Sequence, residues 1–151
     1  LALLSLHERS RDWAGACDDA AELERRGAGN FASRLAHYHC ELALEAEVRG
    51  DQAQADAELD KAREAAPTAA RPLVTRGQRL AREGQPYQAL KTWETLLSVA
   101  PASFGLVAAD YAKATLLAQS TAAPTGTDAS SAAHLLLHAR ADGRRPRAAS
   151  R

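Results

Sequence analysis

The chain has 151 residues, a length that fits one domain of ordinary size. Nineteen basic and 19 acidic side chains give a formal net charge of zero. This balance argues against a nucleic-acid binder, because such proteins usually carry a basic excess that neutralises phosphates. Isoleucine is absent and much of the 46% hydrophobic share is alanine, so the composition favours helices over a sheet.

The two cysteines, Cys17 and Cys40, lack the close spacing of a zinc or redox motif. We therefore predict buried, reduced thiols, a reducing compartment, and no metal or cofactor in this chain. No apolar run approaches the roughly 18 residues that span a bilayer. The chain opens with Leu1-Ala2-Leu3-Leu4 and contains no methionine, which we interpret as the middle of a helix in a fragment of a longer protein.

Taken along the chain, the apolar pattern predicts helices near residues 1–9, 12–26, 31–48, 52–65, 69–82, 86–99 and 102–118. Residues 119–127 are polar and rich in helix breakers, and they predict a loop. A further helix over 128–142 is predicted to cap the last apolar face. The basic stretch 143–151 predicts a disordered tail.

An internal repeat becomes visible when residues 36–69 are laid over 70–103. Four pairs of landmarks coincide at one common offset: Gly50 with Gly84, Ala55 with Ala89, Leu59 with Trp93, and Pro67 with Pro101. The glycines permit the left-handed backbone that ends a helix, and the alanines allow two helices to approach closely. The Leu and Trp side chains fill the space between hairpins, and the prolines stop the second helix.

A degenerate earlier repeat occupies residues 1–30, with Ala16, Ala20 and Leu23 at the packing positions and a lengthened loop at 27–30. The common offset is 34, the period typical of tetratricopeptide repeats. We therefore predict an all-α fold, a tetratricopeptide-type α-solenoid of antiparallel helical hairpins over residues 1–118. It comprises the partial repeat 1–30, repeats 31–69 and 70–103, and the further helix 102–118.

In such a solenoid the first helix of each hairpin lines a groove, and this groove is the predicted binding site. The candidate groove residues are His37, Cys40, Glu41, Leu44, Arg71, Thr75, Gln78 and Arg82. Two of these, Arg71 and Arg82, are able to pair with an acidic partner segment, although the pattern favours solvated surface charges.

No catalytic or metal motif accompanies the groove. His37 and Cys40 stand one helical turn apart, but two ligands do not complete a tetrahedral metal site. We expect His39 to pack between helices with one ring nitrogen hydrogen-bonded. No nucleophile motif or phosphate-binding glycine loop is found, so the sequence predicts a binding module without catalysis.

The string Leu35-Ala36-His37-Tyr38-His39-Cys40-Glu41-Leu42-Ala43 resembles the first helix of one hairpin in the lipopolysaccharide assembly protein B family (LapB, also called YciM). With the loop placement, the resemblance covers about residues 1–118. It implies an adaptor on the cytoplasmic face of the bacterial inner membrane, where an N-terminal helix anchors it. The implied partners are the protease FtsH and the deacetylase LpxC, whose turnover the family promotes to restrain lipopolysaccharide synthesis.

This sequence departs from that family in lacking the membrane helix, the C-terminal metal domain with two CxxC pairs, and a recognisable repeat after residue 118. Family members have also been labelled N-acetylglucosaminyl transferases, so an alternative is the substrate-binding arm of such an enzyme. A third interpretation is self-association through an uncovered hairpin face.

Overall fold

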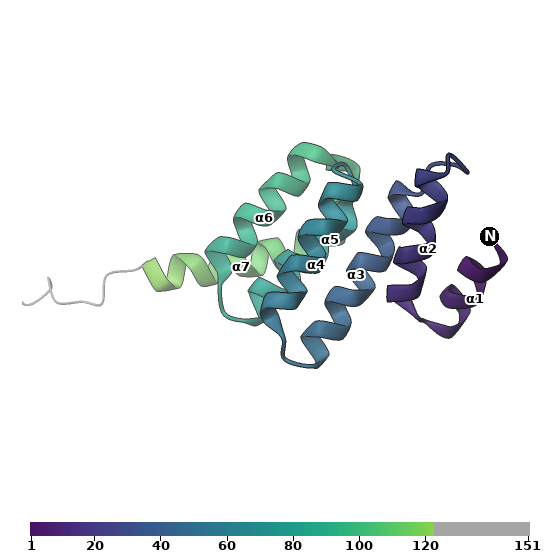
Figure 1. The fold of residues 1–151 in the computed structure, drawn as a ribbon. Coiled ribbons are helices and arrows are strands. Elements are labelled where there is room, and N and C mark those ends of the chain that lie inside the picture. The colour runs from purple at the N-terminus through teal and green to yellow at the C-terminus, as the bar shows by residue number, and fades with distance from the viewer. Residues whose placement is uncertain (123–151) are drawn as a thin grey trace, which may run out of the picture. The chain divides into compact units, whose positions relative to one another are not determined.

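The computed structural model describes residues 1–122, and these residues are all-α, as predicted. Their elements are α1 (Ala2–Ser10), α2 (Trp13–Arg25), α3 (Ala32–Val48), α4 (Gln52–Ala65), α5 (Ala70–Arg82), α6 (Pro86–Val99), the 3₁₀ helix η1 (Pro101–Leu106) and α7 (Ala108–Ala122) (Figure 1). The predicted capping helix 128–142 and tail 143–151 lie outside the described residues. Residues Leu1–Ala118 form one compact unit, to which the hairpins belong.

The prediction for residues 102–127 is wrong in two respects. The single helix 102–118 is interrupted, because η1 ends at Leu106 and α7 begins only at Ala108. Between them Val107 has φ −122° and ψ 2°, outside the α-helical range, shortly after the weak helix former Gly105. The predicted loop also begins too early, since 119–122 continue α7 and Pro124 is the first strong breaker in the sequence.

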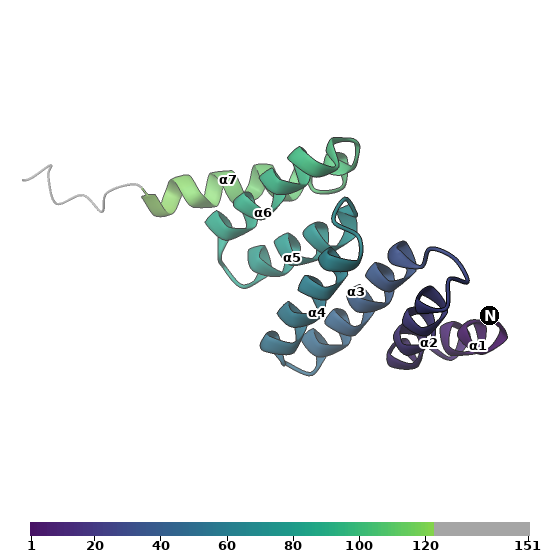
Figure 2. The ribbon, with the colours of Figure 1, turned by 45° about the horizontal axis from the view of Figure 1, so that its top comes forward.

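The helices are joined by short connections into pairs, α1 with α2, α3 with α4, and α5 with α6 (Figures 1 and 2). The second and third pairs repeat each other closely. Helices α4 and α6 begin at Gln52 and Pro86 and end at Ala65 and Val99, so both boundaries recur at the offset of the landmark residues. The sequence period is therefore also the period of the secondary structure.

The turn inside each pair explains why glycine recurs. Gly50 and Gly84 have φ values of 77° and 74°, where a side chain would be strained. After each glycine the next N–H reaches back into the helix, from Asp51 to the Ala46 carbonyl and from Gln85 to the Leu80 carbonyl, both at 2.9 Å. These hydrogen bonds satisfy carbonyl groups that the end of a helix would otherwise leave unpaired.

The same pattern of hydrogen bonds ends α1, but with Arg11 in place of glycine. Arg11 has φ 56° and is the non-glycine residue with positive φ among residues 1–122. Its N–H donates to the Glu8 carbonyl at 3.3 Å, and the Asp12 N–H donates to the His7 carbonyl at 3.0 Å. The Asp12 side chain then caps α2 by accepting from the Gly15 N–H, as Asp51 caps α4.

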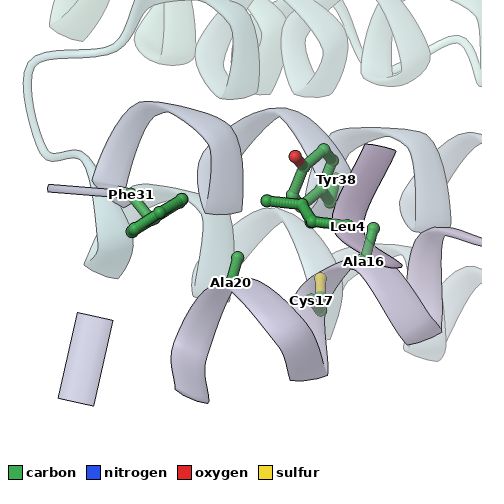
Figure 3. Packing of buried hydrophobic residues seen from close by; sticks show 6 residues of the cluster. All are labelled: Leu4, Ala16, Cys17, Ala20, Phe31 and Tyr38. Carbon is green, nitrogen blue, oxygen red and sulfur yellow. The ribbon is translucent and has the colours of Figure 1, made fainter. Parts of the chain in front are cut away.

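The apolar core is distributed over three clusters. The first joins α1, α2 and α3 through Leu4, Ala16, Cys17, Ala20, Phe31 and Tyr38 (Figure 3). The second joins α3 and α4 through Ala36, Cys40, Ala43, Leu59 and Ala62. The third joins α5, α6 and the start of α7 through Leu73, Ala89, Trp93, Leu96, Val107 and Ala114. The predicted packing residues Ala55, Leu59, Ala89 and Trp93 have no exposed surface, whereas Pro67 and Pro101 lie exposed beyond the ends of α4 and α6.

One close approach inside the third hairpin was not anticipated. A Cβ on Gly77 of α5 would lie 2.1 Å from the Trp93 indole nitrogen of α6, so only glycine fits there. The equivalent positions one repeat earlier hold Ala43 and Leu59, which share the second cluster. The larger partner in α6 is thus matched by the smaller residue in α5.

Candidate functional site

The candidate site is the surface lined by α3, α5 and α7 together with Arg11 and Trp13 at the start of α2, here called the inner face. Arg71 of α5 donates to the Glu41 carboxylate and contacts the His37 ring of α3. Arg82 donates to Glu47 at 2.8 Å, which adds a second bridge between α5 and α3. On the other side of α5, the Gln78 amide donates to the Asp110 carboxylate of α7 at 3.3 Å. Polar contacts therefore cross from each first helix to the next.

These contacts sort the predicted groove residues into two groups. His37, Glu41, Leu44, Arg71, Gln78 and Arg82 all keep exposed surface on this face. Cys40 and Thr75 do not, because Cys40 is fully buried and Thr75 is only 9% exposed. Helix α3 packs against α2, α4 and α5, which leaves a narrow stripe to solvent. Assigning Cys40 and Thr75 to the groove surface was therefore wrong.

The two predicted arginines already have acidic partners within the chain. Glu41 pairs with Arg71, and Glu47 pairs with Arg82. A carboxylate from another protein would have to displace these glutamates. Exposed pairs of this kind contribute roughly 0–1 kcal/mol, so exchange of one carboxylate for another costs little.

Two hollows open on the inner face. The C-terminal hollow, about 360 Å³, is lined by Gln78, Ala81, Arg82, Pro86, Asp110, Lys113, Ala114 and Leu117. Its cation Lys113 makes no ion pair with residues 1–122. The N-terminal hollow, about 380 Å³, is lined by Arg11, Trp13, Glu41, Leu44, Glu45, Val48 and Arg49. Both combine charged rims with apolar walls, and sequence periodicity did not reveal either of them.

The indole of Trp13 is held in the N-terminal hollow by aromatic neighbours on α3. It stacks on Tyr38 with ring centroids 6.1 Å apart and meets the His37 ring edge-on at 5.6 Å. Tyr38 is itself fixed by a hydrogen bond to Glu8, and its burial together with that carboxylate raises the pKa of the phenol to about 12. The tyrosine is therefore a neutral hydrogen-bond donor over the physiological pH range.

A buried polar cluster joins α2, α3 and α4. The Nδ1 of His39 lies 2.7 Å from Glu58, which is only 4% exposed. This confirms the expectation that His39 packs between helices with one nitrogen hydrogen-bonded. Gln54 and Lys61 donate to the other Glu58 oxygen at 2.7 and 2.8 Å. Burial acts to raise the pKa of Glu58, but the hydrogen bonds from Lys61 and His39 outweigh it and lower the pKa.

The same cluster brings Cys17, His39 and Glu58 together, a thiol–imidazole–carboxylate grouping that the sequence did not reveal. The Cys17 sulfur lies 3.9 Å from both ring nitrogens of His39, so it is not directed at either one. Burial and the Glu58 charge raise the pKa of the Cys17 thiol to about 11. A nucleophilic cysteine needs the opposite, a lowered pKa and access for a substrate.

Both cysteines are free and buried, as predicted, and burial also raises the pKa of Cys40 to about 11. Within residues 1–122 no group of three His, Cys, Asp or Glu side chains is arranged to hold a metal ion. The structure thus places both thiols in the packing of the hairpins.

Arg79 is a second buried polar residue that the sequence did not single out. It is 4% exposed and donates to Gln52 at 2.9 Å and to Glu83 at 3.2 Å. It also pairs with Asp56 and lies 3.6 Å from Glu47. These partners come from α3, α4 and the end of α5, so one guanidinium ties the second hairpin to the third.

None of the described helices is both long and apolar enough to cross a membrane. Comparison of the chain with protein-family models and with curated proteins finds no match.

Proposed function

We propose that this chain is a tetratricopeptide-type solenoid that binds a protein segment along its inner face and carries out no reaction of its own. The observation that carries the proposal is that the sequence repeat recurs in space. His37 and Arg71, which occupy the same position in successive hairpins, contact each other across the inner face. Equivalent positions become neighbours when hairpins stack as repeats.

The inner face has the properties of a surface for an extended segment. Its two hollows each offer apolar walls and a cation without an ion pair among residues 1–122, Arg11 in one and Lys113 in the other. Between them the charges of α3 and α5 are already paired. A partner segment that places side chains in the hollows would gain apolar contact without leaving new charges unpaired.

A binding role also agrees with the chemistry of the buried groups. The Cys17–His39–Glu58 cluster lies in the packing of three helices, and its thiol has a raised pKa. Its geometry suits a hydrogen-bonded core better than a nucleophile, because a nucleophile must be activated and reachable.

We further propose, from the resemblance to the LapB family, that the partners are FtsH and LpxC and that the chain serves in the control of lipopolysaccharide synthesis at the cytoplasmic face of the inner membrane. In this proposal the 35–43 string has two roles within α3. Ala36, Cys40 and Ala43 pack in the core, whereas His37 and Glu41 lie on the inner face.

The proposal is tested by capture of partners from solubilised bacterial inner membranes on the immobilised chain. Lys113→Glu reverses a charge of the C-terminal hollow that has no ion pair within residues 1–122. Lys91→Glu is the matched control, because Lys91 is also exposed but lines a different hollow with Asp60 and Arg76. We expect recovery of FtsH and LpxC to fall with Lys113→Glu alone. Recovery of neither protein by the unaltered chain would contradict the adaptor proposal.

The alternative of an N-acetylglucosaminyl transferase arm makes a different prediction. It requires this chain to bind UDP-N-acetylglucosamine. Calorimetry that detects no heat at millimolar sugar nucleotide would remove this alternative for the chain.

A further inference from the structure

The residue that closes α1 is unusual among the helix ends of residues 1–122. Three other helices end on Gly27, Gly50 or Gly84, with φ values of 71°, 77° and 74°. At the equivalent place in α1 stands Arg11, with φ 56° and ψ 30°. An L side chain in this conformation approaches the following carbonyl, so arginine is less favourable here than glycine. The fold alone gives no reason for an arginine at this position.

The side chain of Arg11 makes no polar contact within the described residues. Arg11 is exposed, and its guanidinium makes no hydrogen bond or ion pair with any side chain of residues 1–122. An unfavourable backbone conformation that persists without a local contact suggests that the side chain acts on something outside the chain.

The surroundings of Arg11 indicate what that contact would be. Arg11 lines the N-terminal hollow together with the apolar side chains of Trp13, Leu44 and Val48. Val48 is 90% exposed, so this apolar wall is uncovered. The wall and the free guanidinium are thus presented side by side on the inner face.

The two glutamates of this hollow have cationic partners, whereas Arg11 has no carboxylate partner among residues 1–122. Glu41 is held by Arg71, and Glu45 lies 4.0 Å from Arg49. Arg11 is the cation of the hollow that lacks such a carboxylate among residues 1–122. The free site therefore suits one negative group, while the two glutamates on the rim disfavour a polyanion such as a nucleic acid or an acidic lipid surface.

We propose that Arg11 and the N-terminal hollow bind an acidic residue of a partner peptide that is flanked by an apolar side chain. The Arg11 guanidinium takes the carboxylate, and Trp13, Leu44 and Val48 cover the apolar neighbour. The inference rests on the proposed scaffold function and deepens it by naming the chemistry of the bound segment.

The experiment uses a randomised heptapeptide library, selected on the immobilised chain of 151 residues. We expect the enriched peptides to contain Asp or Glu beside an apolar residue. Their binding to the Arg11→Gly variant should fall by about tenfold, the loss expected for one charge-assisted contact. Arg11→Asn, which tolerates the left-handed backbone without a charge, should lose as much, and Arg11→Lys should retain part of the binding.

Two controls separate binding from folding. Arg9→Ala removes a neighbouring exposed arginine that does not line the hollow, and it should leave peptide binding unchanged. Arg11→Gly should melt a few degrees higher than the unaltered chain because the backbone conformation is relieved. A variant that is more stable and yet binds less cannot owe its loss to unfolding.

The outcomes distinguish this inference from the function on which it rests. If the enriched peptides bind Arg11→Gly within about twofold of the unaltered chain, or contain no acidic residue, the Arg11 site is wrong while the scaffold proposal stands. If the chain enriches no peptide at all, both proposals fail.

Discussion

The contact between Gly77 and Trp93 allows a quantitative test of how the hairpins pack. In Gly77→Ala the new methyl group would lie 2.1 Å from the indole nitrogen and 2.5 Å from Cε2, against 3.4 Å or more in an ordinary contact. Trp93 has no exposed surface and cannot swing into solvent. The indole or α5 must therefore shift by more than about 1 Å, and overpacking of this kind costs about 1–3 kcal/mol.

Part of that cost is offset, because alanine is about 1 kcal/mol better than glycine inside a helix. We therefore expect Gly77→Ala to lower the free energy of unfolding by about 0–2 kcal/mol. Trp93→Leu should cost about 2–3 kcal/mol through the cavity it leaves. The double variant recreates the Ala43 and Leu59 combination of the preceding hairpin. Its loss of unfolding free energy should therefore be smaller than the sum of the two single losses by about 1–2 kcal/mol.

The assay is urea unfolding followed by far-ultraviolet circular dichroism, since one of the variants removes a tryptophan. Gly105→Ala is the matched control, because a Cβ there meets nothing within 4 Å and the residue has no positive φ. It should be neutral or slightly stabilising. If the two substitutions at 77 and 93 prove additive to within about 0.5 kcal/mol, the size matching between α5 and α6 is refuted.

Three further predictions follow from the described contacts. Asp51→Ala removes the acceptor for the Gln54 N–H, 3.0 Å away, and should cost about 1 kcal/mol of unfolding free energy, whereas Asp18→Ala, which caps no helix, should change the urea midpoint little. Because the folded-state pKa of Glu58 is lowered from 4.5, its stabilisation is present above that pH and lost as the pH falls through the folded-state pKa. Urea midpoints from about pH 6 to pH 3 should therefore fall less in Glu58→Gln than in the unaltered chain, and parallel curves would refute this assignment. Cys17 and Cys40, buried with pKa values of about 11, should react with a thiol reagent at neutral pH only after denaturation, and fast labelling of the folded chain would contradict their placement.

Much of the helical framework could be predicted from local signals. Gly50, Gly84 and the aspartates at 12 and 51 mark helix ends because their preferences act within a few residues. The common offset of the repeats then identified the packing positions, since equivalent residues in a repeat face equivalent neighbours. The break between η1 and α7 could not be predicted in this way because it depends on the backbone at Val107, and no strong breaker marks that residue.

The candidate site was less predictable than the framework. The sequence pattern predicted which residues of α3 share one face. It could not predict that Cys40 is fully buried, because that burial depends on how closely α4 packs against α3. The pairing of Arg71 with Glu41 and the gathering of Cys17, His39 and Glu58 join residues far apart in the chain. Such contacts follow from tertiary packing, which a single sequence does not encode in a visible pattern.

The guanidinium of Arg79 has a mechanical consequence. Inside each hairpin the helices meet mainly through apolar side chains, with the His39–Glu58 contact as an addition in the second hairpin. Between α4 and α5 the arginines at 76 and 79 bridge to Asp56, Asp60 and Gln52. Moderate salt affects apolar packing little, whereas the pairs that Arg76 forms with the exposed carboxylates of Asp56 and Asp60 weaken as the ionic strength rises. The joint between the second and third hairpins is thus the place where solution conditions would soften the array and alter the angle at which the two ends of the inner face meet a partner.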